Sequence, residues 1–256
     1  MPKGILYLVG LHIGNVDDVS KRTLDYIKNA KNLVIEREEA FERIWPSLGI
    51  EKPNANLISI EYTSNGGEPG FSNEEKYTNE VINLLNNGED VYVLADEGMP
   101  GVADPGTLLV QQAIQNGIVV KSTPGPSIAM AATAVTGTMH NFIFESFLPF
   151  EKEHRIQFLK VRKDALYPMV IVLRNEIRDP LARGPMYGDE IPNFLDECID
   201  VLGEKRGAAL CYNLTMPNER VVRGSLQRLK EYFNGREREP SLITMVIDSK
   251  HGHMAV

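Results

Sequence analysis

The chain has 256 residues, of which 43% are hydrophobic and 24% charged, and its formal net charge is −8. This length allows one large domain or two modest ones with a sizeable buried core. We expect neither a membrane span nor export, because the apolar runs are short and no signal-peptide pattern opens the chain. The two cysteines, Cys198 and Cys211, make no disulfide framework, which favours the cytoplasm. The acidic balance argues against a general nucleic-acid binder, so any RNA contact needs a local patch.

The first half of the chain alternates strand-like with helix-like segments. Apolar runs predict buried strands at residues 4–9, 32–36, 90–94 and 119–122. Helical spacing and capping signals predict helices between residues 17 and 30, between 72 and 88, at 107–116 and at 128–136. This alternation is typical of a mostly parallel sheet covered on both faces.

The second half has more strands and fewer helices. Strands are predicted at residues 141–146, 168–174, 207–212, 219–223 and 242–248, and helices at 151–162, 190–202 and 225–233. This pattern favours a mixed sheet. A domain boundary is predicted near Pro124 or near Pro149, and residues 249–256 are expected to form a frayed tail.

Three loops rich in glycine or proline follow predicted strands: Gly10–Asn15, Ala95–Gly106 and Thr123–Ser127. Open α/β sheets bind ligands beyond the carboxyl ends of their strands, and glycine lets a backbone come close to a ligand. The Ala95–Gly106 loop, with its three glycines and two prolines, indicates a ligand-binding role most clearly. For Gly10–Asn15, a purely structural tight turn remains an alternative to ligand binding. For the alanine-rich helix after Ser127, the alternative is a closely packed core helix.

Other catalytic motifs are missing from the sequence. It contains no Gly-x-Gly-x-x-Gly, no Walker A sequence and no Gly-x-Ser-x-Gly elbow. The histidines are scattered, so we expect no zinc or other metal site; they are His12, His140, His154, His251 and His253. Hydrolytic and redox chemistry therefore find little support.

Several segments of the sequence, taken together and in chain order, match the motifs of a known protein superfamily. They are Leu6–Val9, Ile13–Val19, Ala95–Gly106, Pro124–Ser127, Phe144–Pro149, and Asn213–Thr215 followed by Glu219, Arg223 and Gly224. In this order they resemble the tetrapyrrole-methylase superfamily of methyltransferases that depend on S-adenosylmethionine. Within it, the chain is most similar to the branch that methylates a ribose 2′-hydroxyl of cytidine in small-subunit ribosomal RNA.

The resemblance implies an α/β fold of two α/β domains, residues 1–123 and 124–248, with S-adenosylmethionine in the cleft between them. The first sheet would be mostly parallel and the second mixed, and the protein would be a homodimer. The resemblance also implies cofactor contacts, many of them through the main chain. They are assigned to Leu11, His12, Met99, Val102, Ser127, Ile128, Leu173, Tyr212 and Ser241.

The chain also departs from that branch. The branch usually has Thr-Pro-Ile-Gly-Asn where this chain has Leu11–Asn15 (LHIGN), and Glu-Asp-Thr-Arg where it has Glu36–Glu39 (EREE). Charged residues that the branch carries within Leu173–Arg178 and Tyr212–Met216 are reduced as well. The cofactor loops match the motifs of the branch better than the substrate-side residues do. Three alternatives to methylation of RNA therefore stay open. They are a small molecule such as a tetrapyrrole, a protein side chain, and cofactor binding without catalysis.

Methyl transfer from a sulfonium is an in-line displacement that depends mainly on alignment, and positioning can contribute up to ~7–11 kcal/mol. A hydroxyl acceptor also needs a base, for which Glu36 and Glu145 are the candidates. Arg155 and Arg178 are candidates to hold a phosphate or carboxylate of the substrate. The structural alternatives are a strand-end carboxylate for Glu36, a carboxylate bonded to a backbone turn for Glu145, and surface charge for both arginines.

Overall fold

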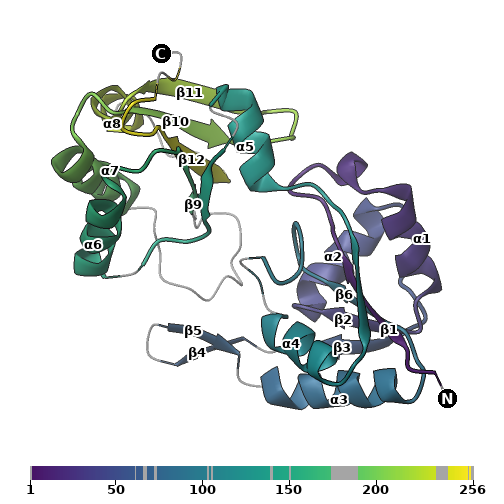
Figure 1. Ribbon diagram of the computed structural model, residues 1–256. Coiled ribbons are helices and arrows are strands. Elements are labelled where there is room, and N and C mark those ends of the chain that lie inside the picture. Colours follow the sequence, from purple (N-terminus) through teal and green to yellow (C-terminus); the bar gives the residue numbers. More distant parts are fainter. Residues whose placement is uncertain are drawn as a thin grey trace. The chain divides into compact units, whose positions relative to one another are not determined.

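The computed structural model describes residues 2–60, 62–65, 68–71, 74–102, 104, 106–138, 141–149, 151–173, 190–234, 242–252 and 254. The chain divides into two compact units, Met1–Ser127 and Ile128–Val256, and each has its own five-stranded sheet (Figure 1). The sequence-based boundary lies after Thr123, whereas residues 124–127 group with the first unit.

The sheet of the first unit is parallel throughout, which confirms the predicted mostly parallel sheet. Its strands lie in the order β3-β2-β6-β1-β7. Their bounds are β1 Ile5–Val9, β2 Asn32–Ile35, β3 Asn56–Ser59, β6 Val91–Leu94 and β7 Val119–Thr123. Because β6, β1 and β7 are adjacent and parallel, the loops that follow them leave the same edge of the sheet.

Helices cover both faces of this sheet. On one face, Ile27 of α1 (Lys21–Asn29) and Phe41 of α2 (Glu38–Ser47) pack against alternate strand residues such as Leu33. On the other face, α3 (Glu74–Asn86) and α4 (Thr107–Gln115) pack against Val34 and its neighbours. Each fully buried aliphatic or aromatic side chain contributes about 1.5–3 kcal/mol, so these two layers fix the strand ends that carry the loops.

Parts of the first unit differ from the sequence prediction. The helix expected from residue 17 begins at Lys21, because Ser20 Oγ accepts the Thr23 N–H at 3.1 Å and caps it there. The preceding residues Val16–Asp18 form a short 3₁₀ turn, η1. The sequence reasoning also missed α2, β3 and an antiparallel pair of strands, β4 Tyr62–Asn65 and β5 Glu68–Phe71.

The sheet of the second unit is mixed, as predicted. Its order is β11-β10-β12-β9-β8, with β8 parallel to β9 and the other neighbours antiparallel. The strands are β8 Ile143–Glu145, β9 Met169–Leu173, β10 Gly207–Tyr212, β11 Arg220–Ser225 and β12 Ile243–Ile247.

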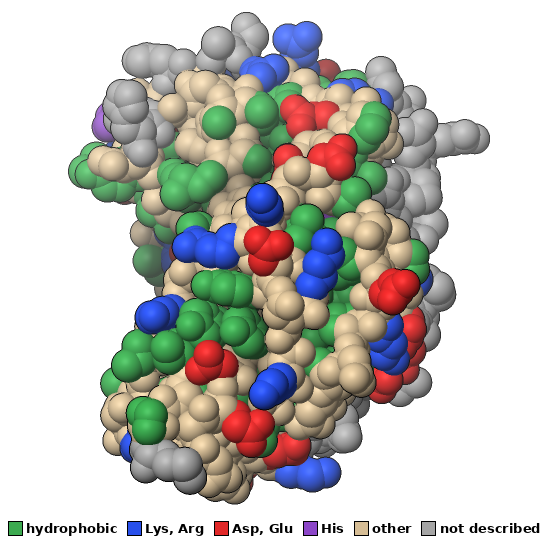
Figure 2. All heavy atoms as spheres, turned by 90° about the vertical axis from the view of Figure 1, so that its right-hand side faces the viewer, with side chains coloured by type: hydrophobic (Ala, Val, Ile, Leu, Met, Phe, Trp, Pro, Cys, Tyr) green, Lys and Arg blue, Asp and Glu red, His purple; other side chains and the backbone are tan. Residues whose placement is uncertain are grey.

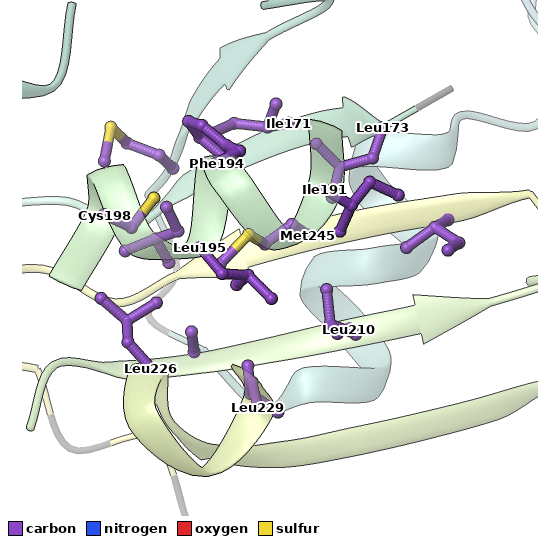
Figure 3. Packing of buried hydrophobic residues seen from close by; sticks show 14 of the residues in the cluster. Ile171, Leu173, Ile191, Phe194, Leu195, Cys198, Leu210, Leu226, Leu229 and Met245 are labelled. Carbon is purple, nitrogen blue, oxygen red and sulfur yellow. The ribbon is translucent and has the colours of Figure 1, made fainter. Parts of the chain in front are cut away.

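Among the described residues, four helices flank this second sheet. On one face, Ala129 and Ala132 of α5 (Ile128–Thr136) pack against Val170 and Val246, so its small side chains bring helix and sheet close together. The other face carries α6 (Lys152–Arg162), α7 (Glu190–Leu202) and α8 (Leu226–Asn234). Figure 3 shows α7 and α8 side chains packed with strand residues in this core.

Two further findings concern membranes and thiols. Within the part of the chain that the structure describes, no helix has the length and hydropathy of a membrane span. Cys198 and Cys211 are free, buried thiols of the second unit, and burial raises the pKa of Cys211 to about 12. Both side chains therefore act as small apolar residues of the core.

Candidate functional site

Main-chain hydrogen bonds join the three loops at the edge of the first sheet. The Leu11 N–H donates to the Gly98 carbonyl at 2.8 Å, and the Gly98 N–H donates to the His12 carbonyl at 2.9 Å. The Gly10 N–H donates to the Thr123 carbonyl at 3.0 Å. The loops after β1, β6 and β7 thus form one connected structure, which we call the loop junction.

The loop junction needs glycine where two of its backbones meet. A Cβ atom on Gly10 would lie 2.6 Å from the Gly125 nitrogen and 2.6 Å from Met99 Sδ. A Cβ atom on Gly125 would lie 2.8 Å from the Gly10 Cα. All three distances are far below a normal contact, so any larger residue at either position would separate the loops. Gly10 therefore serves loop-to-loop packing as well as the turn.

Glu36 and Arg37, at the end of β2, hold the start of the second loop. Glu36 is 5% exposed and accepts the Asp96 N–H at 2.9 Å. Arg37 Nε donates to Asp96 Oδ2 at 2.7 Å. Of the two candidate bases, Glu36 thus binds the backbone of the loop that also carries Met99 and Val102. Sequence reasoning noted Arg37 only as a departure from the related branch and missed this ion pair.

We predict that Glu36→Ala destabilises the protein by about 1–3 kcal/mol, because it leaves the Asp96 N–H without its acceptor. Glu36→Gln keeps an amide oxygen at the same position and should cost less than about 1 kcal/mol. Chemical denaturation of both variants measures the difference. If both variants abolished methyl transfer while their stability stayed that of the wild type, Glu36 would be a proton acceptor instead.

His12 lies at the centre of the loop junction and is 9% exposed. Its Nδ1 accepts the Gly14 N–H at 3.3 Å, where Gly14 has a φ of 149°. Desolvation lowers the pKa of His12, and the charge of Asp18 opposes this shift only in part. The imidazole is therefore neutral at neutral pH.

The lowered pKa predicts that protein stability falls in mild acid. As the pH drops below the ordinary value of 6.5, the unfolded chain takes up a proton on His12 before the folded chain does. The stability that neutral His12 contributes is fully present above pH 6.5. Below that pH it declines by at most about 1.4 kcal/mol per pH unit. Urea denaturation at about pH 7.5 and about pH 5.5 tests this. Between these two pH values, His12→Gln should lose less stability than the wild type does.

The other predicted site residues divide into several groups. Met99, Ser127 and Ile128 are half-buried, and Val102 is 54% exposed. Leu11, Leu173 and Tyr212 have their side chains in the cores of their own units, as Figure 3 shows for Leu173. Any ligand contact that these three make must therefore come mainly from backbone atoms. Arg178 and Ser241 lie outside the described residues.

The remaining charged candidates form ion pairs within the second unit. Glu145 of β8 pairs with Arg162 of α6. Arg155 is 6% exposed, and its Nε and Nη2 each lie 2.9 Å from a carboxylate oxygen of Glu197, which is 4% exposed. The Arg155 guanidinium thus joins α6 to α7 inside the unit. Sequence reasoning did not single out Glu197.

The turn between β10 and β11 carries backbone strain in the segment Asn213–Thr215. Asn213 and Thr215 have φ values of 49° and 67°, which non-glycine residues rarely adopt. Asn213 exchanges main-chain and side-chain bonds with Leu242, at 2.8 and 3.1 Å, and Glu219 accepts the Thr215 N–H at 2.6 Å. Strain that is held in this way is typical of functional segments.

Among the residues described, no group of three or more His, Cys, Asp or Glu side chains is arranged to hold a metal ion. The chain is a two-domain α/β protein in which three loops meet at the carboxyl ends of the strands of a parallel sheet. A family model described as "Tetrapyrrole (Corrin/Porphyrin) Methylases" matches residues 5–230. The chain therefore belongs to the tetrapyrrole methylase family of methyltransferases that depend on S-adenosylmethionine, which confirms the expectation from its motifs.

Relatives and solved structures agree with this assignment. The ribosomal RNA small subunit methyltransferase I of Pseudomonas aeruginosa is 35% identical over 91% of this chain and 74% of its own length. The protein of the same name from Thermotoga maritima is 27% identical over 96% of this chain and 99% of its own. A crystal structure of diphthine synthase matches with a TM-score of 0.71 at 18% identity, covering 98% of this chain and 92% of that one. At that identity the structural match shows the fold alone.

Proposed function

We propose that this protein transfers the methyl group of S-adenosylmethionine to small-subunit ribosomal RNA. The observation that carries this proposal is the 35% identity, over 91% of the chain, to a relative with that activity in its name. The charges on the face drawn in Figure 2 are of both signs, because Lys and Arg side chains lie among Asp and Glu side chains there.

The loop junction suits the adenosyl group in two respects. The close approach of Gly10 and Gly125 beside Met99 holds the first and third loops together, so each loop restricts the position of the other's backbone. His12 adds a buried polar ring atom, Nε2, that has no partner among the described residues. We assign the cofactor to the surface of the loop junction, with Met99, Val102, Ser127 and Ile128 as its further contacts. The contacts assigned to Leu173, Tyr212 and Ser241 stay predictions.

When bound, S-adenosylmethionine supplies an electrophilic methyl group on a sulfonium. The protein's own part is to fix the orientation of the cofactor, and joined loops suit this because each restricts its neighbours. Positioning of this kind can lower the activation free energy by up to ~7–11 kcal/mol. Glu36 acts by holding the second loop, and Glu145 remains the proposed acceptor of the hydroxyl proton. We further infer from the family resemblance a homodimer that works in the cytoplasm.

Radiolabelled methyl transfer tests the proposed substrate. The protein is incubated with labelled S-adenosylmethionine and with small ribosomal subunits, free ribosomal RNA, cellular protein or a small-molecule extract. We expect label in ribosomal RNA, recovered as a 2′-O-methylated nucleoside after nuclease digestion. Label in the protein or small-molecule fraction would contradict an RNA substrate. Cofactor binding with no label in any fraction would contradict catalysis altogether.

The assigned cofactor surface makes a prediction for Val102. Val102→Trp should weaken binding of S-adenosylhomocysteine at least about tenfold, because the indole would occupy the space beside the second loop. The side chain is 54% exposed, so unfolding should change little. Val161→Trp, at a 69% exposed position on α6, is the matched control. Equal affinities of the two variants in calorimetry would contradict the assigned surface.

A further inference from the structure

The loop junction uses its inner main-chain groups for bonds between loops, which makes the ring of His12 stand out among the described residues. The N–H groups of Gly10, Leu11 and Gly98 all bond between loops, and the Gly10 carbonyl also accepts from Thr23 Oγ1 at 3.1 Å. His12 Nε2 is buried and has no hydrogen-bond partner among the residues that the structure describes. Burying an unpaired polar atom is unfavourable, so an atom of this kind in a folded protein requires an explanation.

The hydrogen bond to the other ring nitrogen, Nδ1, shows which of the two nitrogens of His12 carries the proton. Nδ1 accepts the Gly14 N–H at 3.3 Å, so Nδ1 carries no proton. The ring is neutral at neutral pH, because desolvation lowers the pKa of His12. The single ring proton is therefore on Nε2. The unpaired atom is an N–H donor without charge, in surroundings that disfavour charge.

We propose that the Nε2–H of His12 donates a hydrogen bond to an uncharged acceptor on the adenosine half of the cofactor, a ring nitrogen or a ribose oxygen. This inference rests on the proposed function and specifies one contact within it. A carboxylate prefers a charged donor, which this ring is not, so the amino-acid half of the cofactor suits it less.

Two substitutions separate the roles of the two ring nitrogens. His12→Asn keeps an acceptor at the same number of bonds from the backbone as Nδ1, and so can keep the Gly14 bond while losing the Nε2 donor. His12→Gln keeps an amide donor at the position of Nε2 but loses the Nδ1 acceptor. We expect His12→Asn to bind S-adenosylhomocysteine about tenfold more weakly than wild type, and His12→Gln to stay within about threefold.

The choice of ligand locates the acceptor. 5′-Methylthioadenosine keeps the adenosine but lacks the carboxylate and ammonium groups of S-adenosylhomocysteine. Calorimetry should show the same fold-loss for both ligands in His12→Asn. In ¹⁵N-histidine spectra of the wild type, the Nε2-protonated form should be present without ligand, and its Nε2 signal should shift when either ligand binds. A histidine with only a structural role would show no such shift.

The outcomes distinguish this contact from the function on which it rests. If the wild type bound neither ligand, the proposed function and this inference would both fail. If the wild type bound both ligands and His12→Asn bound them equally well, the contact alone would be overturned. A loss that was confined to S-adenosylhomocysteine would overturn the assignment to adenosine, because the acceptor would then lie on the amino-acid half.

Discussion

Replacing Arg155 with methionine is expected to lower the free energy of unfolding by about 3–5 kcal/mol, the usual cost of breaking a buried ion pair by removing one partner. Arg155 and Glu197 are 6% and 4% exposed, and two N–O distances of 2.9 Å join them. The substitution would leave the Glu197 carboxylate charged and buried without this partner. Chemical denaturation of the full chain measures the loss.

A second substitution serves as the control for this prediction. Arg155→Met combined with Glu197→Leu removes both charges, and replacing a buried pair with apolar residues is often neutral. The double variant should therefore recover most of the stability, and the double-mutant cycle should show strong coupling. If Arg155→Met kept wild-type stability and lost affinity for RNA instead, Arg155 would be the substrate-binding residue that the sequence suggested.

Replacing Gly10 with alanine should abolish cofactor binding and destabilise the protein by about 1–3 kcal/mol, the range found for overpacking. The new methyl group would lie 2.6 Å from the Gly125 nitrogen, so the first and third loops must separate. That movement would also strain the bond from the Gly10 N–H to the Thr123 carbonyl. Calorimetry with S-adenosylhomocysteine and thermal denaturation measure the two effects.

Gly207→Ala is the matched control for Gly10→Ala. A Cβ at Gly207 would lie 3.5 Å from Asp248, an ordinary contact, and this glycine has no positive φ. The control should be neutral or stabilising by about 0.4–1 kcal/mol and should bind the cofactor normally. If Gly10→Ala bound S-adenosylhomocysteine as tightly as the control does, the loop junction would not be the cofactor surface.

The sequence predicted the elements whose signals are local. The β1 segment is a short apolar run and α5 follows Pro124–Ser127, so strand and helix could be placed within a residue or two. The α2 helix was missed because Pro46 lies inside it and no side chain caps its start. The strand β3 (NLIS) was missed because polar residues stand at both of its ends and it lacks the longer apolar runs of β2 (NLVI) and β6 (VYVL).

The loops of the site were predictable, but the contacts among them were not. Glycine and proline show where a chain can turn, and parallel strands bring the turns to one edge. Which backbones touch depends on tertiary packing, so neither the approach of Gly10 to Gly125 nor the bond from Asp96 to Glu36 has a local signal. The same applies to Arg155, whose partner Glu197 lies on a different helix, 42 residues away.

Backbone amide NMR on addition of S-adenosylhomocysteine tests the cofactor surface most directly. If the loop junction binds the cofactor, the largest shifts will fall on the three loops, at Gly10–Gly14, Gly98–Val102 and Gly125–Ile128. Strand ends on the opposite edge of the first sheet, such as Ile5 and Val91, should change little. Saturable binding whose shifts lie elsewhere and leave those three loops unchanged would contradict this assignment.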